Sequence, residues 1–600
     1  MDADDMQDQY SLKTLQAPVL SGWQLRWFVR LVETFELPLR FVVRRSGFNR
    51  LLELQRDSDL VQIPVHDVLA AQQGNMTDQQ RADFVKEMDA VFSELFEMDS
   101  ARSRTSRSVW DYVQMYRAAS STPLQVVADL LDLVKAQDPR PFDYVEHKHG
   151  ATPCSTALNC FSQIDEEQAL DAARQSTERW QSGHPISLLD GVPVAIKECF
   201  KVRNYRTTCG LGSVRNSSRS LEQDDAPLVA VLRDLGCVVV GLTTMDENGL
   251  GVRGFNASWG QVRNSVNPQF VSGGSSAGSG ACVGAGMCPI AVGVDGGGSI
   301  RIPAGFNGIV GVKPTYGRVN GTGCFPPGAK ATSHSGPMAS CVLDAALEFY
   351  AMLLAGPDPG LPDPHPQLPR PKELLDLVKT GSIKSLKLGV FWPWFNDCAP
   401  QIRDACAAFV EKMQQDGGAT VIPITIPNLE DMRVAHSCQI ITEHASSLVD
   451  HGLESLRDEM GLDFRAKLQA AMYLRQNPQF VRGSYAIRAD AMALFRKLFE
   501  DEHLDAIVTP TTAILPPRVP SNVVTGELNG QLDSLIMRYA FVGNFVGLPA
   551  GTVNIGLGPA PDCLPIGMQF MCAPWAEAKL LHLMFWCEQR APQRARAEAP

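Results

Sequence analysis

The chain has 600 residues, of which 44% are hydrophobic and 20% charged, and a formal net charge of −12. These proportions are typical of a globular protein with a large core, and the negative charge argues against nonspecific nucleic-acid binding. The 15 cysteines form no CxxC pair and no zinc-ligand spacing, so we expect reduced thiols and no metal site. The acidic first residues do not resemble a secretory signal, and no apolar run is long enough to predict a transmembrane helix.

Residues 1–130 read as helical. Apolar residues at positions 23–37 surround a polar stripe of Arg26, Arg30 and Glu33 at helical spacing, and Pro38 is expected to end this helix. Aromatic residues are interleaved here with six arginines, at positions 26, 30, 40, 44, 45 and 50. Such a segment could lie on a membrane surface, and the alternative is an ordinary helix packed on the core with its arginines in water.

Two further helix starts have clear signals. Thr77 and Gln80 match a capping box, and Pro123 stands at a first helical position. We expect an N-terminal helical region over residues 1–120, which could cap a substrate entrance, and a catalytic domain over residues 121–595. We expect a Pro-rich linker at residues 356–371, inside the catalytic domain.

From about residue 140 the pattern alternates between helices and short β-rich runs. Helices over 166–182 and 226–235 are each followed by a glycine, Gly183 and Gly236, that is typical of a helix end. Strands are expected at residues 192–196, 237–240, 386–391, 420–426, 505–508, 550–557 and 566–571. This alternation predicts an α/β fold with a buried sheet.

The most informative segment contains a Gly-Gly-Ser-Ser run ending at Ser276 and the run Asp295-Gly-Gly-Gly-Ser299. It is not a phosphate loop, because no Lys-Ser/Thr pair follows its glycines and dinucleotide-binding spacing is absent. The backbone N–H groups of Gly296, Gly297, Gly298 and Ser299 could instead converge on one oxygen. That arrangement is an oxyanion hole, with Ser299 placed as a nucleophile beside it.

A nucleophilic serine needs a base. No G-x-S-x-G elbow surrounds Ser299 and no histidine is near these glycines in sequence. A buried lysine can serve, since desolvation disfavours its charged form. Lys197 follows the strand predicted at 192–196 and could point into a pocket. Taken singly, Lys197 could be a solvated strand end and each glycine run an ordinary loop.

Together these motifs resemble the amidase signature family, over roughly residues 120–590. Ser275 and Ser299 are 24 positions apart, as in that family, and residues 189–197 match its lysine-bearing strand. The resemblance implies a Ser299–Ser275–Lys197 triad, a cis peptide bond between Gly274 and Ser275, and no cofactor or metal. It also implies a large mixed, twisted β-sheet with helices on both faces, and supporting roles for Asp295, Arg301 and Ser276. For Asp295 and Arg301 the alternative to a supporting role in catalysis is a purely structural ion pair.

Within the family the chain is most similar to the plant-type fatty acid amide hydrolases, for example in the third glycine, Gly298, and in residues 394–397 and 574–578. This similarity implies hydrolysis of N-acylethanolamines and related long-chain amides to fatty acid and amine through an acyl-enzyme. It also implies an intracellular, peripheral membrane location, on the cytosolic face of the endoplasmic reticulum or plasma membrane, and a homodimer.

Three other functions stay open at this point. One is a glutamine-hydrolysing subunit of an amidotransferase, against which the long N-terminal extension argues. A general short-chain amidase is the second. The third is a non-catalytic amidase-like binding protein, against which the presence of Lys197, Ser275 and Ser299 argues.

Overall fold

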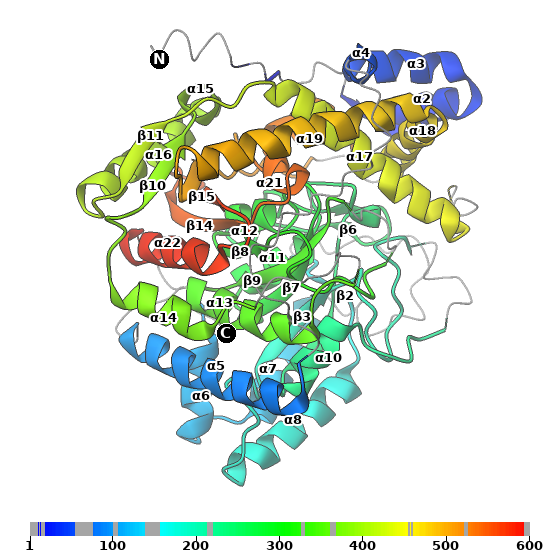
Figure 1. Ribbon diagram of the computed structural model, residues 1–600. Helices are drawn as coiled ribbons and strands as arrows, with labels where there is room; N and C mark the ends of the chain where they lie inside the picture. Colours follow the sequence, from blue (N-terminus) through cyan, green and yellow to red (C-terminus); the bar gives the residue numbers. More distant parts are fainter. Residues whose placement is uncertain are drawn as a thin grey trace.

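The computed structural model describes residues 10, 12–13, 19–53, 76–99, 106–137, 157–212, 220–325, 331–359, 368–453, 457, 460–520 and 526–592. Within these residues a mixed sheet of 11 strands forms the centre of the molecule (Figure 1). Its order is β11 (Thr420–Pro423), β10 (Lys387–Val390), β12 (Ala506–Pro510), β15 (Pro565–Cys572), β14 (Ala550–Leu557), β8 (Val310–Lys313), β9 (His334–Ala339), β7 (Ile290–Asp295), β3 (Pro193–Lys197), β4 (Val238–Thr243) and β2 (Phe161–Gln163). Two-stranded pairs are formed by β1 (Leu20–Ser21) with β13 (Glu527–Leu528), and by β5 (Phe255–Asn256) with β6 (Gly260–Gln261). The predicted α/β fold with a large mixed sheet is confirmed.

Except at the edge strand β11, the sheet is buried on both faces, which explains why most of its strands read as apolar runs. Side chains alternate between the two faces of a strand. On β3, Val194 and Ile196 enter one hydrophobic core and Ala195 enters another. On β12, Val508 and Ile507 are divided between cores in the same way.

Helices cover both faces (Figure 1). The core that contains Val194 is completed by α5 (Asp78–Met98), α6 (Val109–Arg117), α10 (Pro227–Asp234), α13 (Val342–Met352), α14 (Pro371–Lys379), α16 (Pro400–Gln415) and α22 (Glu577–Arg590). The other cores are completed by α7 (Pro123–Gln137), α8 (Glu166–Gln181), α11 (Ala277–Gly284), α12 (Arg301–Asn307), α17 (Leu429–Asp450), α19 (Pro478–Glu500) and α21 (Phe541–Phe545). The remaining helical segments are α2 (Gly22–Thr34), α3 (Glu36–Arg45), α4 (Arg50–Glu53), α15 (Trp392–Phe395), α18 (Leu462–Gln476), α20 (Gly530–Ile536), η1 (Glu247–Gly249) and η2 (Leu353–Ala355).

Several helix starts and ends that the sequence predicted are confirmed. Thr77 and Gln80 form the capping box that opens α5, and Pro123 is the first residue of α7. Gly183 and Gly236, which follow α8 and α10, have φ angles of +76° and +90°. A residue with a side chain would be strained in that backbone conformation, so these glycines mark the helix ends for a steric reason.

The prediction that Pro38 ends the first helix is wrong. Helix α2 ends earlier, at Thr34, and Phe35 adopts an extended conformation before α3 begins. Pro38 lies in the first turn of α3. Proline is tolerated there because the first N–H groups of a helix have no partner within the helix.

The N-terminal helices lie in two different places. Helices α2 and α3 pack on α18, whereas α5 packs on α13 and α14, toward the opposite end of the molecule (Figure 1). The expected division near residue 120 stays a prediction, and most of the Pro-rich linker, residues 360–367, lies outside the described residues. None of the helices described combines the length and apolar character needed to cross a membrane.

Candidate active site

The site forms where two neighbouring parallel strands end. Strands β3 and β7 pair in parallel, with Ala195 opposite Ala291. Lys197 is the last residue of β3 and Asp295 the last of β7. The carboxyl ends of parallel strands therefore bring these two segments, far apart in sequence, to one edge of the sheet, where ligands bind in open α/β sheets.

Lys197 and Ser275 are in direct contact. The Lys197 Nζ lies 2.8 Å from Ser275 Oγ and donates a hydrogen bond to the Val294 carbonyl at 3.1 Å. The lysine is only 2% exposed. The peptide bond between Gly274 and Ser275 is cis, as the family resemblance implied.

Ser299 follows β7 and is held beside the Ser275 loop. The Ser276 N–H donates to the Ser299 carbonyl at 3.2 Å. The Ser276 hydroxyl donates to the Val294 carbonyl at 3.2 Å and accepts from the Val294 N–H at 3.3 Å. Ser276 thus ties the loop of one serine to the strand that leads to the other, while Ser299 itself lines a cavity.

The glycine run differs from the predicted cradle at one position. The Gly298 N–H donates to the Asp295 carboxylate at 2.6 Å, so this amide already has a partner and the expectation that it binds an oxyanion is corrected. The amides of Gly296, Gly297 and Ser299 have no such partner within the described chain. Three of the four predicted donors thus stay open to a ligand.

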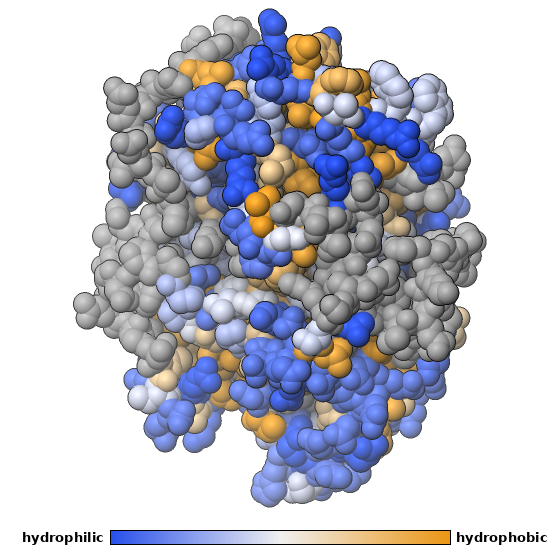
Figure 2. Space-filling view, turned by 90° about the vertical axis from the view of Figure 1, so that its right-hand side faces the viewer, coloured by the Kyte–Doolittle hydropathy of each residue, from blue (hydrophilic) through white to orange (hydrophobic). Residues whose placement is uncertain are grey.

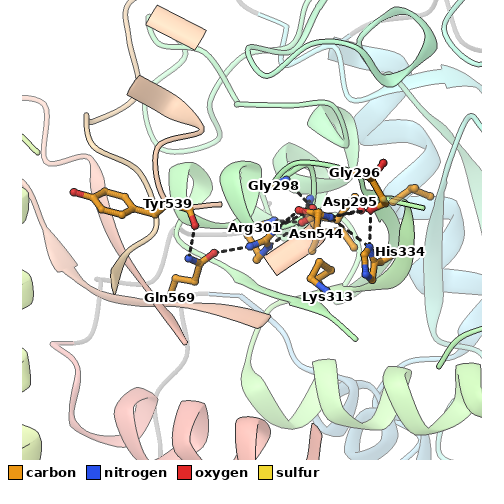
Figure 3. Close-up of polar contacts among 12 residues, drawn as sticks. Asp295, Gly296, Gly298, Arg301, Lys313, His334, Tyr539, Asn544 and Gln569 are labelled. Atoms are coloured by element: carbon orange, nitrogen blue, oxygen red, sulfur yellow. Dashed lines mark hydrogen bonds and ion pairs between the residues drawn. The ribbon is translucent and has the colours of Figure 1, made fainter. Parts of the chain in front are cut away.

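Asp295 and Arg301 form a fully buried ion pair at the base of this loop (Figure 3). Arg301 donates to both carboxylate oxygens of Asp295, at 3.0 and 2.9 Å, and also to Gln569 and Asn544, at 2.6 and 2.5 Å. Burial by itself would raise the pKa of Asp295, but the adjacent Arg301 guanidinium outweighs it and holds that pKa below its usual range. The carboxylate stays charged and accepts from the amides of Gly298 and Ile300.

Two further side chains at this loop were not predicted from the sequence. His436 of α17 donates from Nε2 to the Gly296 carbonyl at 2.8 Å, and Asn544 of α21 donates to the Asp295 carbonyl at 2.7 Å. Burial lowers the pKa of His436 to about 4, so its ring is neutral at physiological pH. The two residues lie 140 and 249 positions from their partners in sequence, and no local motif marks them.

A cavity of about 1030 Å³ runs from the glycine loop to the N-terminal helices. Gly297 and Ser299 line one part, and Trp23, Trp27 and Phe41 of α2 and α3 line another. These three aromatic residues are 76%, 63% and 61% exposed. Figure 2, which faces the side of the molecule where α2 and α3 lie, shows hydrophobic patches among hydrophilic residues in its upper part. Among the described residues, no group of His, Cys, Asp or Glu side chains could hold a metal ion.

Comparisons with known proteins show the family of the chain. The amidase family model matches residues 149–581. The chain is 31% identical to a fatty acid amide hydrolase of Arabidopsis thaliana, over 97% of this chain and 95% of that one, and 32% identical to one of Oryza sativa subsp. japonica, over 98% and 95%. It is also 29% identical to a subunit of the mitochondrial glutamyl-tRNA(Gln) amidotransferase of Anopheles gambiae, over 75% of this chain and 94% of that one.

Solved structures show the same fold. A crystal structure of an amidase superposes with a TM-score of 0.66 at 25% identity, covering 81% of this chain and all of the other. The peptide amidase of Stenotrophomonas maltophilia superposes with a TM-score of 0.63 at 24% identity, over 81% of this chain and 97% of that enzyme. The chain therefore belongs to the amidase family and is an amide hydrolase.

Proposed function

We propose that the protein is a fatty acid amide hydrolase, which cleaves N-acylethanolamines and related long-chain amides with Ser299 as nucleophile. The observation that carries the proposal is the pairing of two features at one place. Lys197 Nζ lies 2.8 Å from Ser275 Oγ, and Ser299 lines a cavity of about 1030 Å³ that aromatic side chains of α2 and α3 also line.

In the proposed reaction, Lys197 accepts a proton from Ser275, and Ser275 accepts one from Ser299. The Ser299 Oγ attacks the amide carbonyl, and open backbone amides of the glycine loop stabilise the negative charge on its oxygen. The proton returns through Ser275 to the leaving amine, as general acid catalysis requires. Water then hydrolyses the ester between Ser299 and the fatty acid, which restores the free hydroxyl.

The lining of the cavity supports a long apolar substrate rather than glutamine. Side chains such as Leu20, Phe28, Val32 and Ile440 contact the cavity, and burying them against an alkyl chain contributes about 25 cal/mol per Å² of apolar surface. Charged side chains of Arg433, Lys467 and Asp533 line the cavity too, so the proposed preference over glutamine rests on the apolar area. The cavity is also as large as a drug-sized ligand site.

We further propose that α2 and α3 contact a membrane, from which the substrate enters. Leu25 and Val29 of α2 face α18, while Trp23 and Trp27 point outward at the edge of the cavity. Exposed tryptophans with neighbouring arginines are typical of helices that lie in a membrane interface. Association into a homodimer stays a prediction from the family resemblance.

The direct test compares hydrolysis of long-chain N-acylethanolamines, short aliphatic amides and glutamine by the wild-type protein and by Ser299→Ala. We expect the highest kcat/KM for the long-chain amides and a loss of at least about 10⁴-fold in Ser299→Ala. Preference for glutamine or short amides would refute the proposed substrate. Equal turnover by Ser299→Ala would refute the proposed nucleophile.

A further inference from the structure

The glycine loop shows a regular relation between fixed carbonyls and open amides. In a trans peptide the C=O of one residue and the N–H of the next lie in the same plane and point in opposite directions. Cis bonds in the described chain occur only at Gly274–Ser275 and Ala560–Pro561, so the peptide planes of this loop are trans. Holding a carbonyl on one side therefore directs the following amide to the other side.

Each of the three open amides follows a carbonyl that is held by a donor. Asn544 donates to the Asp295 carbonyl at 2.7 Å, ahead of the Gly296 amide. His436 donates to the Gly296 carbonyl at 2.8 Å, ahead of the Gly297 amide. The Ile302 N–H donates to the Gly298 carbonyl at 2.7 Å, ahead of the Ser299 amide.

His436 is itself held in place. Its ring packs against Phe541 and Phe545 of α21, with centroid distances of 6.0 and 6.3 Å. A Cβ atom added at Gly297 would lie 2.9 Å from the His436 Cε1, so only glycine lets the ring approach the loop this closely. A carbonyl can only accept, so the Nε2 of His436 must carry the proton.

Asn544 is oriented just as firmly. Its side-chain oxygen accepts from Arg301 at 2.5 Å, which turns its nitrogen toward the Asp295 carbonyl. The same nitrogen donates to the Thr332 carbonyl at 3.1 Å. The amide therefore cannot be reversed without losing these bonds.

We infer that His436 and Asn544 are positioning residues for the oxyanion-binding amides, and that His436 directs the Gly297 N–H toward the substrate oxygen. This inference rests on the proposed serine mechanism. It adds α17 and α21, outside the loops that carry the triad, to the catalytic machinery. Because the donated bond acts on an amide that matters most in the transition state, its loss should lower kcat rather than weaken substrate binding.

The test uses His436→Leu, which removes the donor, and His436→Gln, whose side-chain amide keeps one. We expect His436→Leu to lower kcat by about 10- to 100-fold with an unchanged KM, somewhat less than the loss of a complete oxyanion donor. His436→Gln should recover most of this loss. A matched control is His582→Leu on α22, which removes another buried histidine and should leave kcat unchanged.

A second readout separates orientation from general damage. A long-chain trifluoromethyl ketone adds the Ser299 Oγ to its carbonyl carbon and places an oxyanion in the same cradle. Its Ki should rise in His436→Leu by the factor by which kcat/KM falls, while inhibition by a long-chain hydrocarbon, which places no oxygen in the cradle, should not change. If His436→Leu does not fold, His436→Asn replaces it, because its shorter amide cannot reach the Gly296 carbonyl.

The inference is overturned if the variant without the donor keeps wild-type kcat, if only KM changes, or if His436→Gln is as impaired as His436→Leu. These outcomes are distinct from failure of the proposed function. That failure appears as activity retained in Ser299→Ala or as a different preferred amide, whereas the His436 comparison can be made with whichever amide the enzyme hydrolyses best.

Discussion

The loops over residues 273–301 and the helix pair α2–α3 each depart from the usual distribution of polar and apolar side chains, in opposite ways. In the loops, charged and polar groups such as Ser275, Asp295 and Arg301 are buried. In the helix pair, large apolar side chains such as Trp23 and Leu37 are exposed. Both regions border the same cavity or lie next to it.

Each unusual placement has a cost that only another interaction can offset. A buried charge is destabilising unless it is paired and hydrogen-bonded, and Arg301 meets that condition with bonds to Asp295, Gln569 and Asn544. Exposed aromatic residues are unfavourable in water unless a partner covers them. The buried ion pair of the loops is therefore compensated within the chain, whereas Trp23, Trp27 and Phe41 of the helix pair stay mostly exposed among the described residues.

The largest effect is expected at Lys197, which ends β3 and contacts Ser275 in the buried loops. Replacing Lys197 by Met keeps the length of the side chain but removes the amine that contacts Ser275, so kcat should fall by about 10²- to 10⁴-fold. Labelling of Ser299 by a fluorophosphonate should slow in parallel. A variant that stays folded and retains more than about a tenth of wild-type activity would show that Lys197 is not the base.

The next effect concerns stability. Arg301→Met leaves the Asp295 carboxylate buried without its partner, which should lower the free energy of unfolding by about 3–5 kcal/mol. Denaturant unfolding at neutral pH measures this loss. A loss below about 1 kcal/mol would mean that Asp295 has other compensation.

The same pair predicts how that loss depends on pH. Because the folded-state pKa of Asp295 is below its usual value, the stability from the ion pair is present above about pH 4 and is lost as the pH falls through the folded-state pKa. In Arg301→Met, burial raises that pKa instead, so the carboxyl is neutral in acid. The difference in stability between wild type and variant should therefore shrink toward low pH.

The smallest effect on the protein itself is expected in the helix pair. Replacing Trp23, Trp27 and Phe41 together by Ser should leave kcat on a short soluble amide unchanged, since these side chains are mostly exposed. Binding to phospholipid vesicles should weaken by about tenfold or more, and KM for a long-chain amide in vesicles should rise.

A control for this variant replaces Ile186 and Leu557, which are also exposed apolar residues but lie elsewhere. That variant should bind vesicles like the wild type. Equal vesicle binding by all three proteins would contradict the proposed membrane contact and would leave another partner to cover α2 and α3.

Much of the site could be predicted because its reactive residues lie in short sequence motifs. Gly274-Ser275 and Asp295-to-Ser299 are short motifs whose residue types are required by backbone approach and nucleophilic attack. Seven of the eleven strands of the central sheet were predicted, because burial on both faces makes most of them apolar. Strands β2, β7, β8 and β9 were not among the predicted strands, and β9, with the sequence His-Ser-Gly-Pro-Met-Ala, has no continuous apolar run. The end of α2 could not, since a proline in the first turn of a following helix has the same sequence signal as a helix stop.

What the sequence determined by itself is therefore the family, the α/β class and the candidate nucleophile, bridging serine and lysine. Tertiary structure alone decided which glycine amides stay open, because Asp295 occupies the Gly298 amide and distant helices bring His436 and Asn544 to the neighbouring carbonyls. It also decided that Trp23 and Trp27 face outward beside the cavity. The physical reason is that hydrogen-bond partners and burial depend on contacts between segments far apart in the chain, which no local pattern records.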